Sequence, residues 1–442
     1  MFPYGKEMLA AFQEIITEFH QAPLPELIAR DMPLPEIPHA LRKALIVIGM
    51  RRSGKTWLLY QYMQHLLAQG RAKTQLVYIN FEDDRLYGME AKHFPEMLNA
   101  YWSLYPEHIG QQQVVFFFDE IAEVPGWERF IRRLLDKETM QIVITGSSAK
   151  MLSKEIATNL RGRTITREVF PFSFAEMARV HQWPNTWPLD PKQQAMALNA
   201  IQHYVTWGGF PEALSVTPVL HRELLQGYMD SVIYRDIIER HDVKNHHAVK
   251  QLLLHCLHNP ATLLSVNKVF QQFKARGLSV SKDALYQFVD YLADAYCIFT
   301  VSVYSFSLNK AALKPKKVYL IDTGLVSAYA IKPGYEKAGC LENAVFLHLR
   351  RQCEDIFYFQ TRQGHEVDFL LVPPHGVMQL YQVSVSLQDE ATRQREVCAL
   401  QEAMQELSLS VATIITWHES DIIHVDQGEI RVMPLYQAYV TI

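Results

Sequence analysis

The chain has 442 residues; at roughly 150 residues per domain, this length predicts two or three folded units and not a single core. Hydrophobic residues make up 49% of it and charged residues 20%, which is the balance of a globular protein and excludes a disordered or fibrous one. The formal net charge of -4 excludes a general electrostatic attraction to nucleic acid, so any such contact has to come from a local basic face.

The beginning of the chain, Met1 to Ala10, contains a charged Lys-Glu pair and lacks the apolar core of a secretory signal. No run of about 18 apolar residues follows, so we expect a cytoplasmic protein without a membrane partner. The cysteines have no metal-finger spacing, and we expect reduced, mostly buried thiols. They are Cys256, Cys297, Cys340, Cys353 and Cys398.

Residues 1–40 are predicted to form a helix, roughly Lys6 to His20, followed by a proline-rich arm. Proline at this density is typical of an extended segment that crosses the surface of the next domain.

Residues 41–174 are predicted to form an α/β domain, because short apolar runs alternate with helical patterns. Runs that are apolar on both faces indicate a doubly wound parallel sheet covered by helices on both sides. The predicted strands are 44–48, 75–81, 114–118 and 141–145, and the predicted helices are 56–67 and 127–135.

The remainder of the chain divides into three predicted segments. Residues 175–244 read as a small helical lid, interrupted by the Gly-Gly-Phe-Pro break at 208–211. Residues 245–313 have the helix and strand order of a winged helix. Residues 314–442 are rich in strands, beginning with 317–321, and predict a second α/β domain.

The segment Gly49 to Thr56 matches the complete P-loop pattern G-x-x-x-x-G-K-[ST] between a predicted strand and a predicted helix. Glycines let backbone N–H groups surround the β-phosphate, Lys55 would reach the β- and γ-phosphates, and Thr56 would offer its hydroxyl to Mg²⁺. The pattern therefore predicts an ATP site. Its candidate nucleotide-binding residues are Gly49, Met50, Arg51, Arg52, Ser53, Gly54, Lys55, Thr56 and Trp57.

Two carboxylates, Asp119 and Glu120, end the apolar strand 114–118. Ligands of parallel sheets bind at this end of the strands. We expect Asp119 to hold the Mg²⁺ shell and Glu120 to activate the attacking water as general base, although an apolar run followed by Asp-Glu is also a common surface strand end.

The next strand ends in Thr145-Gly-Ser-Ser148, which brings hydroxyls toward the γ-phosphate. The choice between Thr145, Ser147 and Ser148 stays open, and Ser147 is our nucleotide-binding candidate. Arg161 and Arg163 follow, and either is a candidate to stabilise charge on the γ-phosphate of a neighbouring subunit; the alternative for both is pairing with surface acids.

Together these motifs, with Phe170-Pro-Phe-Ser-Phe174 and Gly208-Gly-Phe-Pro-Glu212, resemble the prokaryotic AAA+ superfamily ATPases of the archaeal-ATPase-like group. The resemblance covers nearly the whole chain. It implies a homo-oligomer, for which a hexameric ring is one candidate, a C-terminal domain of restriction-endonuclease-like type, and nucleotide sensing by Gly209 and Pro211 in the lid.

Restriction-endonuclease-like folds hold Mg²⁺ with a helical Glu, an Asp, and a Glu-x-Lys on adjacent strands. Glu342 and Asp368 fit the first two places, whereas Gln382 and Ser384 stand in the third. Without the second carboxylate and the ammonium, we expect a nuclease-like fold that has no nuclease activity.

The predicted winged helix carries basic side chains that could contact DNA phosphates, although a solvated protein-contact face has similar composition. They are Lys268, Lys274, Arg276 and Lys282.

These observations favour an oligomeric ATPase. A nucleotide-switched regulatory or scaffold protein with slow turnover is the second hypothesis, and an active DNA nuclease is the third.

Overall fold

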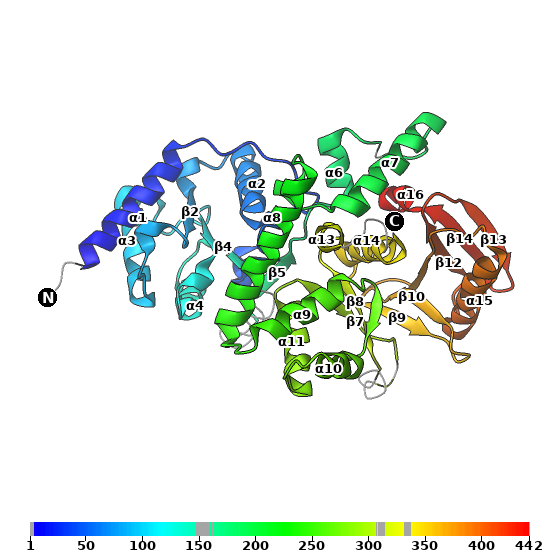
Figure 1. Cartoon of the computed structure of the whole chain (residues 1–442). Helices are drawn as coiled ribbons and strands as arrows, with labels where there is room; N and C mark the ends of the chain where they lie inside the picture. Colours follow the sequence, from blue (N-terminus) through cyan, green and yellow to red (C-terminus); the bar gives the residue numbers. More distant parts are fainter. Residues whose placement is uncertain are drawn as a thin grey trace. The chain divides into compact units, whose positions relative to one another are not determined.

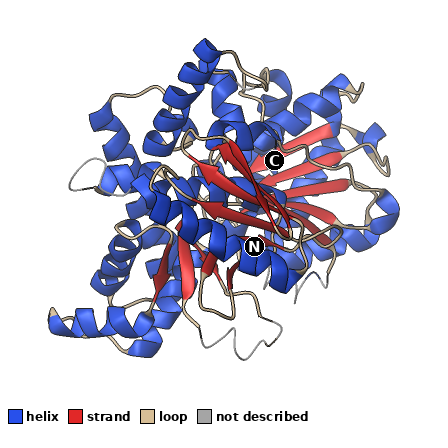
Figure 2. Ribbon diagram, turned by 90° about the vertical axis from the view of Figure 1, so that its right-hand side faces the viewer, coloured by secondary structure: helices blue, strands red, loops and turns tan. Residues whose placement is uncertain are grey.

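The structure is a computed structural model of the chain, and it describes residues 4–146, 160, 162–184, 186–305, 307, 314–330 and 337–441. The chain forms two compact units, Met1–Phe170 and Pro171–Ile442. Each unit contains its own sheets and its own buried core (Figures 1 and 2).

The first unit is built on a five-stranded sheet with the order β2-β3-β4-β1-β5, in which all neighbouring strands are parallel. The strands β1 to β4 confirm the four predicted strands to within one residue at each end. The sequence analysis missed β5, because this edge strand contains a single apolar residue, Ile165, among Thr, Arg and Glu. The strands are β1 (Ala44–Ile48), β2 (Leu76–Asn80), β3 (Val115–Asp119), β4 (Gln141–Gly146) and β5 (Thr164–Glu168).

Helices cover both faces of this sheet, as the alternation of side chains along β3 demonstrates. Phe117 contacts Tyr62 of α2 (Lys55–Ala68), whereas Phe118 contacts Phe130 of α4 (Trp127–Lys137) on the opposite face. The helix α3 (Phe94–Leu104) lies with α4, and α1 (Tyr4–Gln21) packs against α3. The sheet is therefore doubly wound, as predicted from its apolar runs.

The proline-rich arm packs on the α2 face, where Leu34 and Ile37 join the buried core beside β1 and α2. The arm contributes to the fold of the first unit and is held by specific side chains.

The second unit begins with helices: α6 (Phe174–His181), α7 (Pro191–Trp207), α8 (Pro218–Ser231) and α9 (His246–Leu257). Ser173 and Asp190 cap α6 and α7 through capping boxes, which explains where these two helices begin. The helix α8 continues into a π-helix, Val232–Glu239.

A small antiparallel sheet follows, with the order β6-β8-β7. It consists of β6 (Thr262–Leu264), β7 (Ile298–Val301) and β8 (Lys316–Leu320), and α10 (Val266–Ala275) and α11 (Lys282–Asp294) lie between β6 and β7 in the chain. We assigned the strand near 317–321 to the C-terminal α/β domain, and that assignment was wrong. Its backbone pairs with β6 and β7, because the connection from β7 returns the chain to the same sheet.

The C-terminal part contains a mixed six-stranded sheet, in the order β13-β14-β12-β11-β10-β9. Its helices are α14 (Lys337–Gln352) and α15 (Glu390–Leu407), and the buried face of α15 packs on β10, β11 and β12. The strands are β9 (Ile356–Gln360), β10 (Glu366–Leu371), β11 (Gln379–Val383), β12 (Val411–Thr416), β13 (Asp421–Val425) and β14 (Gly428–Pro434). The sequence analysis missed β13 and β14.

The C-terminal elements pack on the helices that open the second unit. Tyr439 of α16 (Leu435–Thr441) stacks on Phe174 of α6, with ring centroids 5.0 Å apart, and meets Tyr204 of α7 edge-on. The short helix α13 (Gly324–Tyr329) packs against α7 and α8. The predicted lid segment is thus part of a continuous packed body in the second unit.

Among the helices of the described ranges, none is both long and apolar enough to cross a lipid bilayer.

Candidate P-loop site and a buried carboxylate cluster

The segment between β1 and α2 forms a tight loop whose shape depends on its glycines. Gly49 has φ +152°, and a Cβ atom there would lie 2.2 Å from the carbonyl oxygen of Val169. Gly54 has φ +98° and stands immediately before α2, where a residue with a side chain would be strained. The loop therefore delivers the N-terminus of α2, with its unpaired N–H groups, to the carboxyl end of the sheet.

Lys55, the first residue of α2, is buried, with 6% of its surface exposed. Its ammonium donates hydrogen bonds to the carbonyl oxygens of Gly49 at 3.2 Å and Met50 at 3.3 Å, and it lies 3.5 Å from Glu120 Oε1. A buried ammonium held by two carbonyls and one carboxylate is already positioned over the loop. It can turn to an anion bound there without first losing a shell of water.

Thr56 and Asp119 join α2 to β3. The Thr56 hydroxyl donates to Asp119 Oδ2 at 2.8 Å, and burial raises the pKa of the Asp119 carboxyl. Adjacent oxygens around Mg²⁺, which binds at 2.0–2.1 Å in octahedral geometry, lie about 2.9 Å apart. The spacing of these two oxygens therefore fits two neighbouring positions in a Mg²⁺ shell.

Thr145 at the end of β4 connects the two acidic residues. Its hydroxyl donates to Asp119 Oδ1 at 2.5 Å and accepts the backbone N–H of Glu120 at 2.8 Å. Glu120 adopts the left-handed conformation, with φ +51°. With this backbone turn, held by Thr145, the Glu120 carboxylate lies 3.5 Å from the Lys55 ammonium. Thr145, left among three alternatives in the sequence analysis, thus holds the Asp119 carboxylate and the backbone turn at Glu120.

The other residues of the loop have different surroundings. Met50 and Ser53 are buried, and Ser53 Oγ has no hydrogen-bond partner among the described residues. Arg51 pairs with Glu82 at 3.4 Å, Arg52 has φ +66°, and 47% of Trp57 is exposed. A buried hydroxyl without a partner beside a helix N-terminus is consistent with a site that receives an anionic ligand.

Sequence reasoning missed Arg30, which comes from the proline-rich arm. Its guanidinium donates to the carbonyl oxygen of Ser53 at 2.9 Å and to that of Phe170 at 2.6 Å. Gln61 of α2 exchanges two hydrogen bonds with the Arg30 backbone, at 2.6 and 3.1 Å. The arm therefore braces the loop from outside. The only sequence signal for this contact was the high proline content, which predicted a segment that crosses the surface of the domain.

We expect Arg30→Ala to lower the free energy of unfolding of the first unit by about 1.5–3 kcal/mol, because two hydrogen bonds from a charged donor are lost and two carbonyls lose their partner. Arg42→Ala is the matched control, since among the described residues the Arg42 side chain makes one exposed hydrogen bond, to the Asp136 carbonyl. Urea unfolding followed by tryptophan fluorescence measures both. Equal losses in the two variants would contradict the bracing role.

The remaining candidates of this region are not all described. Ser147 and Arg161 lie outside the described residues. Arg163 forms an ion pair with Asp136, and 37% of its side chain is exposed. This is the surface pairing that we considered as the alternative to a role at a neighbouring subunit.

Comparisons with known proteins agree with this geometry. Residues 41–178 match the family model described as AAA domain, and residues 198–333 match a domain of unknown function, DUF8612. The uncharacterised protein MJ1544 of Methanocaldococcus jannaschii is 32% identical over 438 residues, which cover 96% of this chain and 94% of that protein. The chain belongs to the MJ1544 family.

Another member of this kind, an uncharacterised protein of Haemophilus influenzae, is 30% identical over 74% of this chain and 78% of its own length. Among solved structures, the Aeropyrum pernix ORC2 protein with ADPNP and ADP aligns with a TM-score of 0.37 and 9% identity, over 74% of this chain and 92% of that one. The ORC1 protein of the same organism, in complex with DNA, aligns with a TM-score of 0.28 and 14% identity, over 75% of this chain and 94% of that one. The AAA-domain match and the parallel sheet establish the first unit as a P-loop domain of AAA+ type.

Gly209 and Pro211, the lid candidates, lie in the second unit of this MJ1544-family chain. The Gly209 N–H donates to Asp322 Oδ2 at 2.7 Å, and a Cβ atom at Gly209 would lie 2.2 Å from the Phe172 carbonyl oxygen. Pro211 begins a short 3₁₀ helix. Burial raises the pKa of Asp322 to about 7. Within the second unit, the absence of a side chain at Gly209 thus allows its backbone to lie close to the Phe172 carbonyl.

The nuclease-like candidates meet at a buried cluster with an ammonium at its centre. Lys317 Nζ lies 2.7 Å from Asp368 Oδ1, 2.8 Å from Glu366 Oε1 and 3.0 Å from Glu342 Oε1, and Tyr319 also donates to Glu342. Sequence reasoning missed Lys317, Glu366 and Tyr319. The lysine stands on β8, about fifty residues before Asp368, so no motif spacing connects the two.

The side chains of Gln382 and Ser384 form hydrogen bonds within the fold near this cluster. Gln382 Oε1 accepts the Asp368 N–H at 3.1 Å, and its amide donates to Glu396 Oε2 at 2.7 Å. Ser384 lies beyond the end of β11, and its hydroxyl donates to the Ser386 carbonyl. The Gln382 amide and the Ser384 hydroxyl therefore both form hydrogen bonds within the fold.

The protonation of the cluster follows from its burial. Burial opposes the charge on Lys317, but the carboxylates of Asp368, Glu342 and Glu366 outweigh it and raise the pKa of the ammonium well above its ordinary value. Burial and the Asp368 charge raise the pKa of Glu342 to about 8. Lys317 therefore keeps its charge at neutral pH, and Glu342 binds a proton more readily than an exposed carboxyl does.

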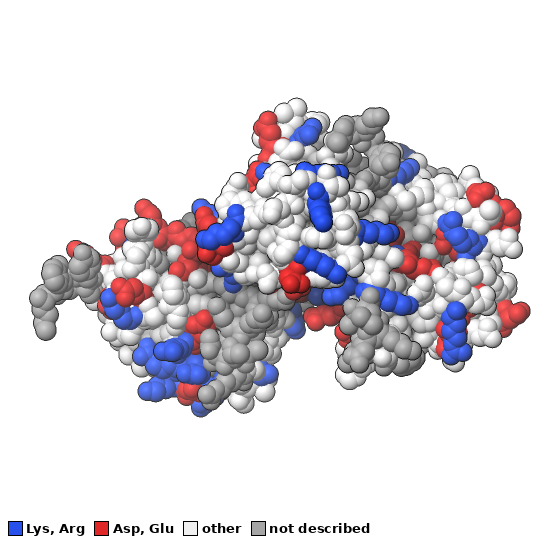
Figure 3. All heavy atoms as spheres, turned by 60° about the horizontal axis from the view of Figure 1, so that its bottom comes forward, with Lys and Arg blue, Asp and Glu red and all other residues white. Residues whose placement is uncertain are grey.

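The winged-helix candidates Lys268, Lys274, Arg276 and Lys282 are all exposed, on or beside α10 and at the start of α11. Within the described part of the chain, none of the four takes part in an ion pair. On the face drawn in Figure 3, the Lys and Arg side chains form several separate groups among uncharged ones. On this face, the described cations do not form one continuous basic band.

Proposed function

We propose that this MJ1544-family protein binds Mg·ATP in its P-loop and hydrolyses it, with Glu120 as the general base. The observation that carries the proposal is the hydrogen-bonded chain from Thr56 through Asp119 and Thr145 to Glu120, next to the buried ammonium of Lys55. At an ordinary surface strand end the acid would be exposed to solvent, whereas Asp119 is buried beside the first turn of the P-loop helix.

Each residue has a defined task in this reaction. The loop N–H groups and Lys55 would bind the phosphates, and Thr56 and Asp119 would hold Mg²⁺. The ion would neutralise charge on the phosphate oxygens. Lys55 would exchange its contact with Glu120 for one with the phosphates, which leaves the Glu120 carboxylate available to accept a proton from the attacking water.

Calorimetry tests the binding step. Mg·ATP added to the full chain is expected to give saturable heat, and Lys55→Ala is expected to remove most of it. No heat with correctly folded protein would overturn the proposal. Unchanged heat in Lys55→Ala would mean that ATP binds at a site other than the P-loop.

The oligomeric part of the proposal rests on Arg163 and Arg161 as residues that reach the nucleotide of a neighbouring subunit. The exposed ion pair between Arg163 and Asp136 contributes little free energy, so it can break in an assembly. Apart from the limit at 313/314, which separates β8 from the strands it pairs with, the domain limits of the sequence analysis remain predictions. The sensing role of Ser147, Gly209 and Pro211 and the cytoplasmic location also remain predictions.

Contact with DNA is a second candidate function, because the three-stranded sheet and the helices α9, α10 and α11 follow in the order of a winged helix. If the four exposed cations neutralise phosphates, the DNA-binding constant falls steeply with salt concentration. Replacing all four by Gln is expected to reduce the magnitude of the slope of log binding constant against log salt concentration by about 3 to 4. Fluorescence polarisation with labelled duplex at several salt concentrations measures the slope, with Lys92→Gln in the first unit as control. Binding by wild type that ignores salt would contradict this function.

For the C-terminal domain we propose a nuclease-like fold that does not cleave DNA. Lys317 already occupies the space between Glu342, Glu366 and Asp368, and in place of a second charged carboxylate Gln382 offers only a neutral amide whose oxygen accepts the Asp368 N–H. DNA incubated with the protein and Mg²⁺ or Mn²⁺ should stay intact. Cleavage that Asp368→Ala abolishes would overturn this part of the proposal.

A further inference from the structure

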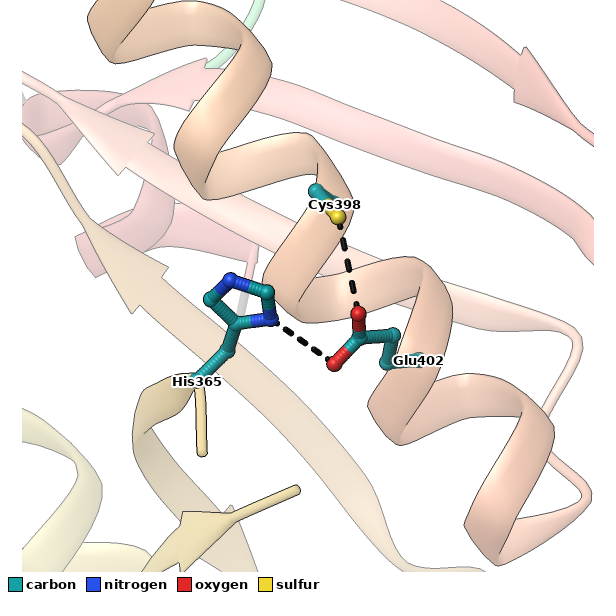
Figure 4. Close-up of side chains that lie close together, drawn as sticks. All are labelled: His365, Cys398 and Glu402. Carbon is teal, nitrogen blue, oxygen red and sulfur yellow. Dashed lines mark hydrogen bonds and ion pairs between the residues drawn. The ribbon is translucent and has the colours of Figure 1, made fainter. Parts of the chain in front are cut away.

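Three side chains of different chemistry converge in the C-terminal part, away from both clusters described above. His365 Nδ1 lies 2.8 Å from Glu402 Oε2, and Cys398 Sγ lies 3.6 Å from Glu402 Oε1. One nitrogen, one sulfur and one oxygen of these residues all lie within 4.8 Å of one another. Figure 4 shows the three side chains pointing toward a common space between the loop before β10 and the helix α15.

The local fold holds these side chains in place. Cys398 and Glu402 are four residues apart on α15 and therefore occupy one face of that helix. His365 is fixed by the turn between β9 and β10, where its N–H donates to Thr361 Oγ1 at 3.0 Å and its carbonyl accepts the Thr361 N–H at 2.8 Å. Thr361 also donates its hydroxyl to Glu402 Oε2 at 2.8 Å. A hydroxyl that orients a ligating carboxylate is a usual second layer of a metal site.

The combination of donors selects the kind of ion. A thiolate and an imidazole suit Zn²⁺, whereas Mg²⁺ and Ca²⁺ prefer a shell of oxygens. Ligands of tetrahedral zinc, at 2.0–2.3 Å, lie about 3.3–3.8 Å apart. The distance of 3.6 Å between Cys398 Sγ and Glu402 Oε1 falls in this range. His365 Nδ1 lies 2.8 Å from the other carboxylate oxygen, Oε2, and would have to move away by about half an ångström if that oxygen is the ligand.

We propose that His365, Cys398 and Glu402 bind one Zn²⁺, with solvent as the fourth ligand. An ion pair between His365 and Glu402 accounts for two of the residues but not for the sulfur, whose contact with the carboxylate is a weak hydrogen bond. Binding would replace the thiol proton by a zinc–sulfur bond and release that proton to solvent. The half-exposed side of the imidazole, of which 40% is open to solvent, leaves room for the water.

The ion would tie the turn of the β9–β10 hairpin to α15. Because it binds the folded state, zinc should raise the thermal stability of the second unit, and the gain should grow with the logarithm of the zinc concentration once that exceeds the dissociation constant. The proposal does not depend on ATP binding, since all three ligands and their supports lie in the second unit.

Cobalt substitution tests the site on the full chain. After treatment with a chelator, Co²⁺ is expected to bind at one ion per chain with a thiolate-to-cobalt absorption band, and Zn²⁺ is expected to displace it. Cys398→Ser should abolish the band and weaken Zn²⁺ binding by about 100-fold or more, and Thr361→Val should weaken it by about 10- to 100-fold.

Cys340→Ser is the matched control, because Cys340 is also a partly exposed thiol, on α14. It should leave the band unchanged. Circular dichroism confirms that each variant is folded, and His365→Ala provides an independent removal of a ligand. The proposal is overturned if the wild type binds no zinc at micromolar concentration, or if the band survives in folded Cys398→Ser.

Discussion

Replacing Glu120 by Gln is expected to lower steady-state ATP hydrolysis by about 10²- to 10⁴-fold, the usual contribution of a general base. The affinity for Mg·ATP should change little, because Gln has nearly the shape of Glu and the phosphate-binding groups remain. The turn at Glu120 should also persist, since its N–H still donates to Thr145. Phosphate release measures turnover, and calorimetry measures binding in the same preparations.

Glu123→Gln is the matched control, three residues farther along the chain and exposed to solvent. It should retain wild-type turnover. The alternative function, a slow nucleotide switch, gives a different result: wild type and Glu120→Gln would then release phosphate at equal, negligible rates while both still bind ATP. That outcome would contradict the role of Glu120 as general base but would leave ATP binding by the P-loop unaffected.

Much of the first unit follows from its sequence, because local signals there agree with the fold. The apolar runs are long enough to be buried strands, and the glycine spacing of the P-loop fixes its backbone. Asp119 and Glu120 could be located because their strand precedes them directly. Thr145 was among the candidates, but its role as the hydrogen-bonded link between the two acids needed the structure.

The residues that escaped prediction share a physical cause: their partners are distant in the chain. Arg30 contacts a carbonyl of the P-loop across 23 positions, and Lys317 meets Asp368 across 51. The zinc candidates also join a hairpin turn to a helix more than thirty residues later. The strand β8 was assigned to the wrong sheet for the same reason, since an apolar run indicates a strand but does not identify its neighbour.

Lys317→Met is expected to destabilise the second unit by about 3–5 kcal/mol at neutral pH, the usual cost of removing one partner from a buried ion pair. Methionine keeps the length and the apolar stem of lysine but leaves the carboxylates of Asp368, Glu342 and Glu366 without their ammonium. Lys316→Met is the matched control, because Lys316 is the exposed neighbour on β8 and should change the free energy of unfolding by less than about 0.5 kcal/mol.

The pH dependence distinguishes a buried charge from lost packing. In the wild type the pKa of Glu342 is raised to about 8 from an ordinary value near 4.5, so its folded form binds a proton more tightly than the unfolded chain does. Its contribution to stability is therefore present below about pH 4.5 and is lost as the pH rises toward 8. Without Lys317 the carboxylates should bind protons still more tightly, so the deficit of Lys317→Met should shrink at pH 5 and grow at pH 8.

A second substitution keeps this prediction testable if the single variant folds poorly. Lys317→Met combined with Glu342→Gln removes a titrating carboxyl that carries negative charge at the upper end of this pH range. The double variant should recover part of the lost stability at pH 8 and depend less on pH. Urea unfolding of both variants between pH 5 and 8 measures the effect. A deficit that is constant across this range, or no recovery in the double variant, would mean that Lys317 contributes packing alone and does not neutralise the cluster. In that case its presence would no longer explain why the carboxylates should leave DNA uncut.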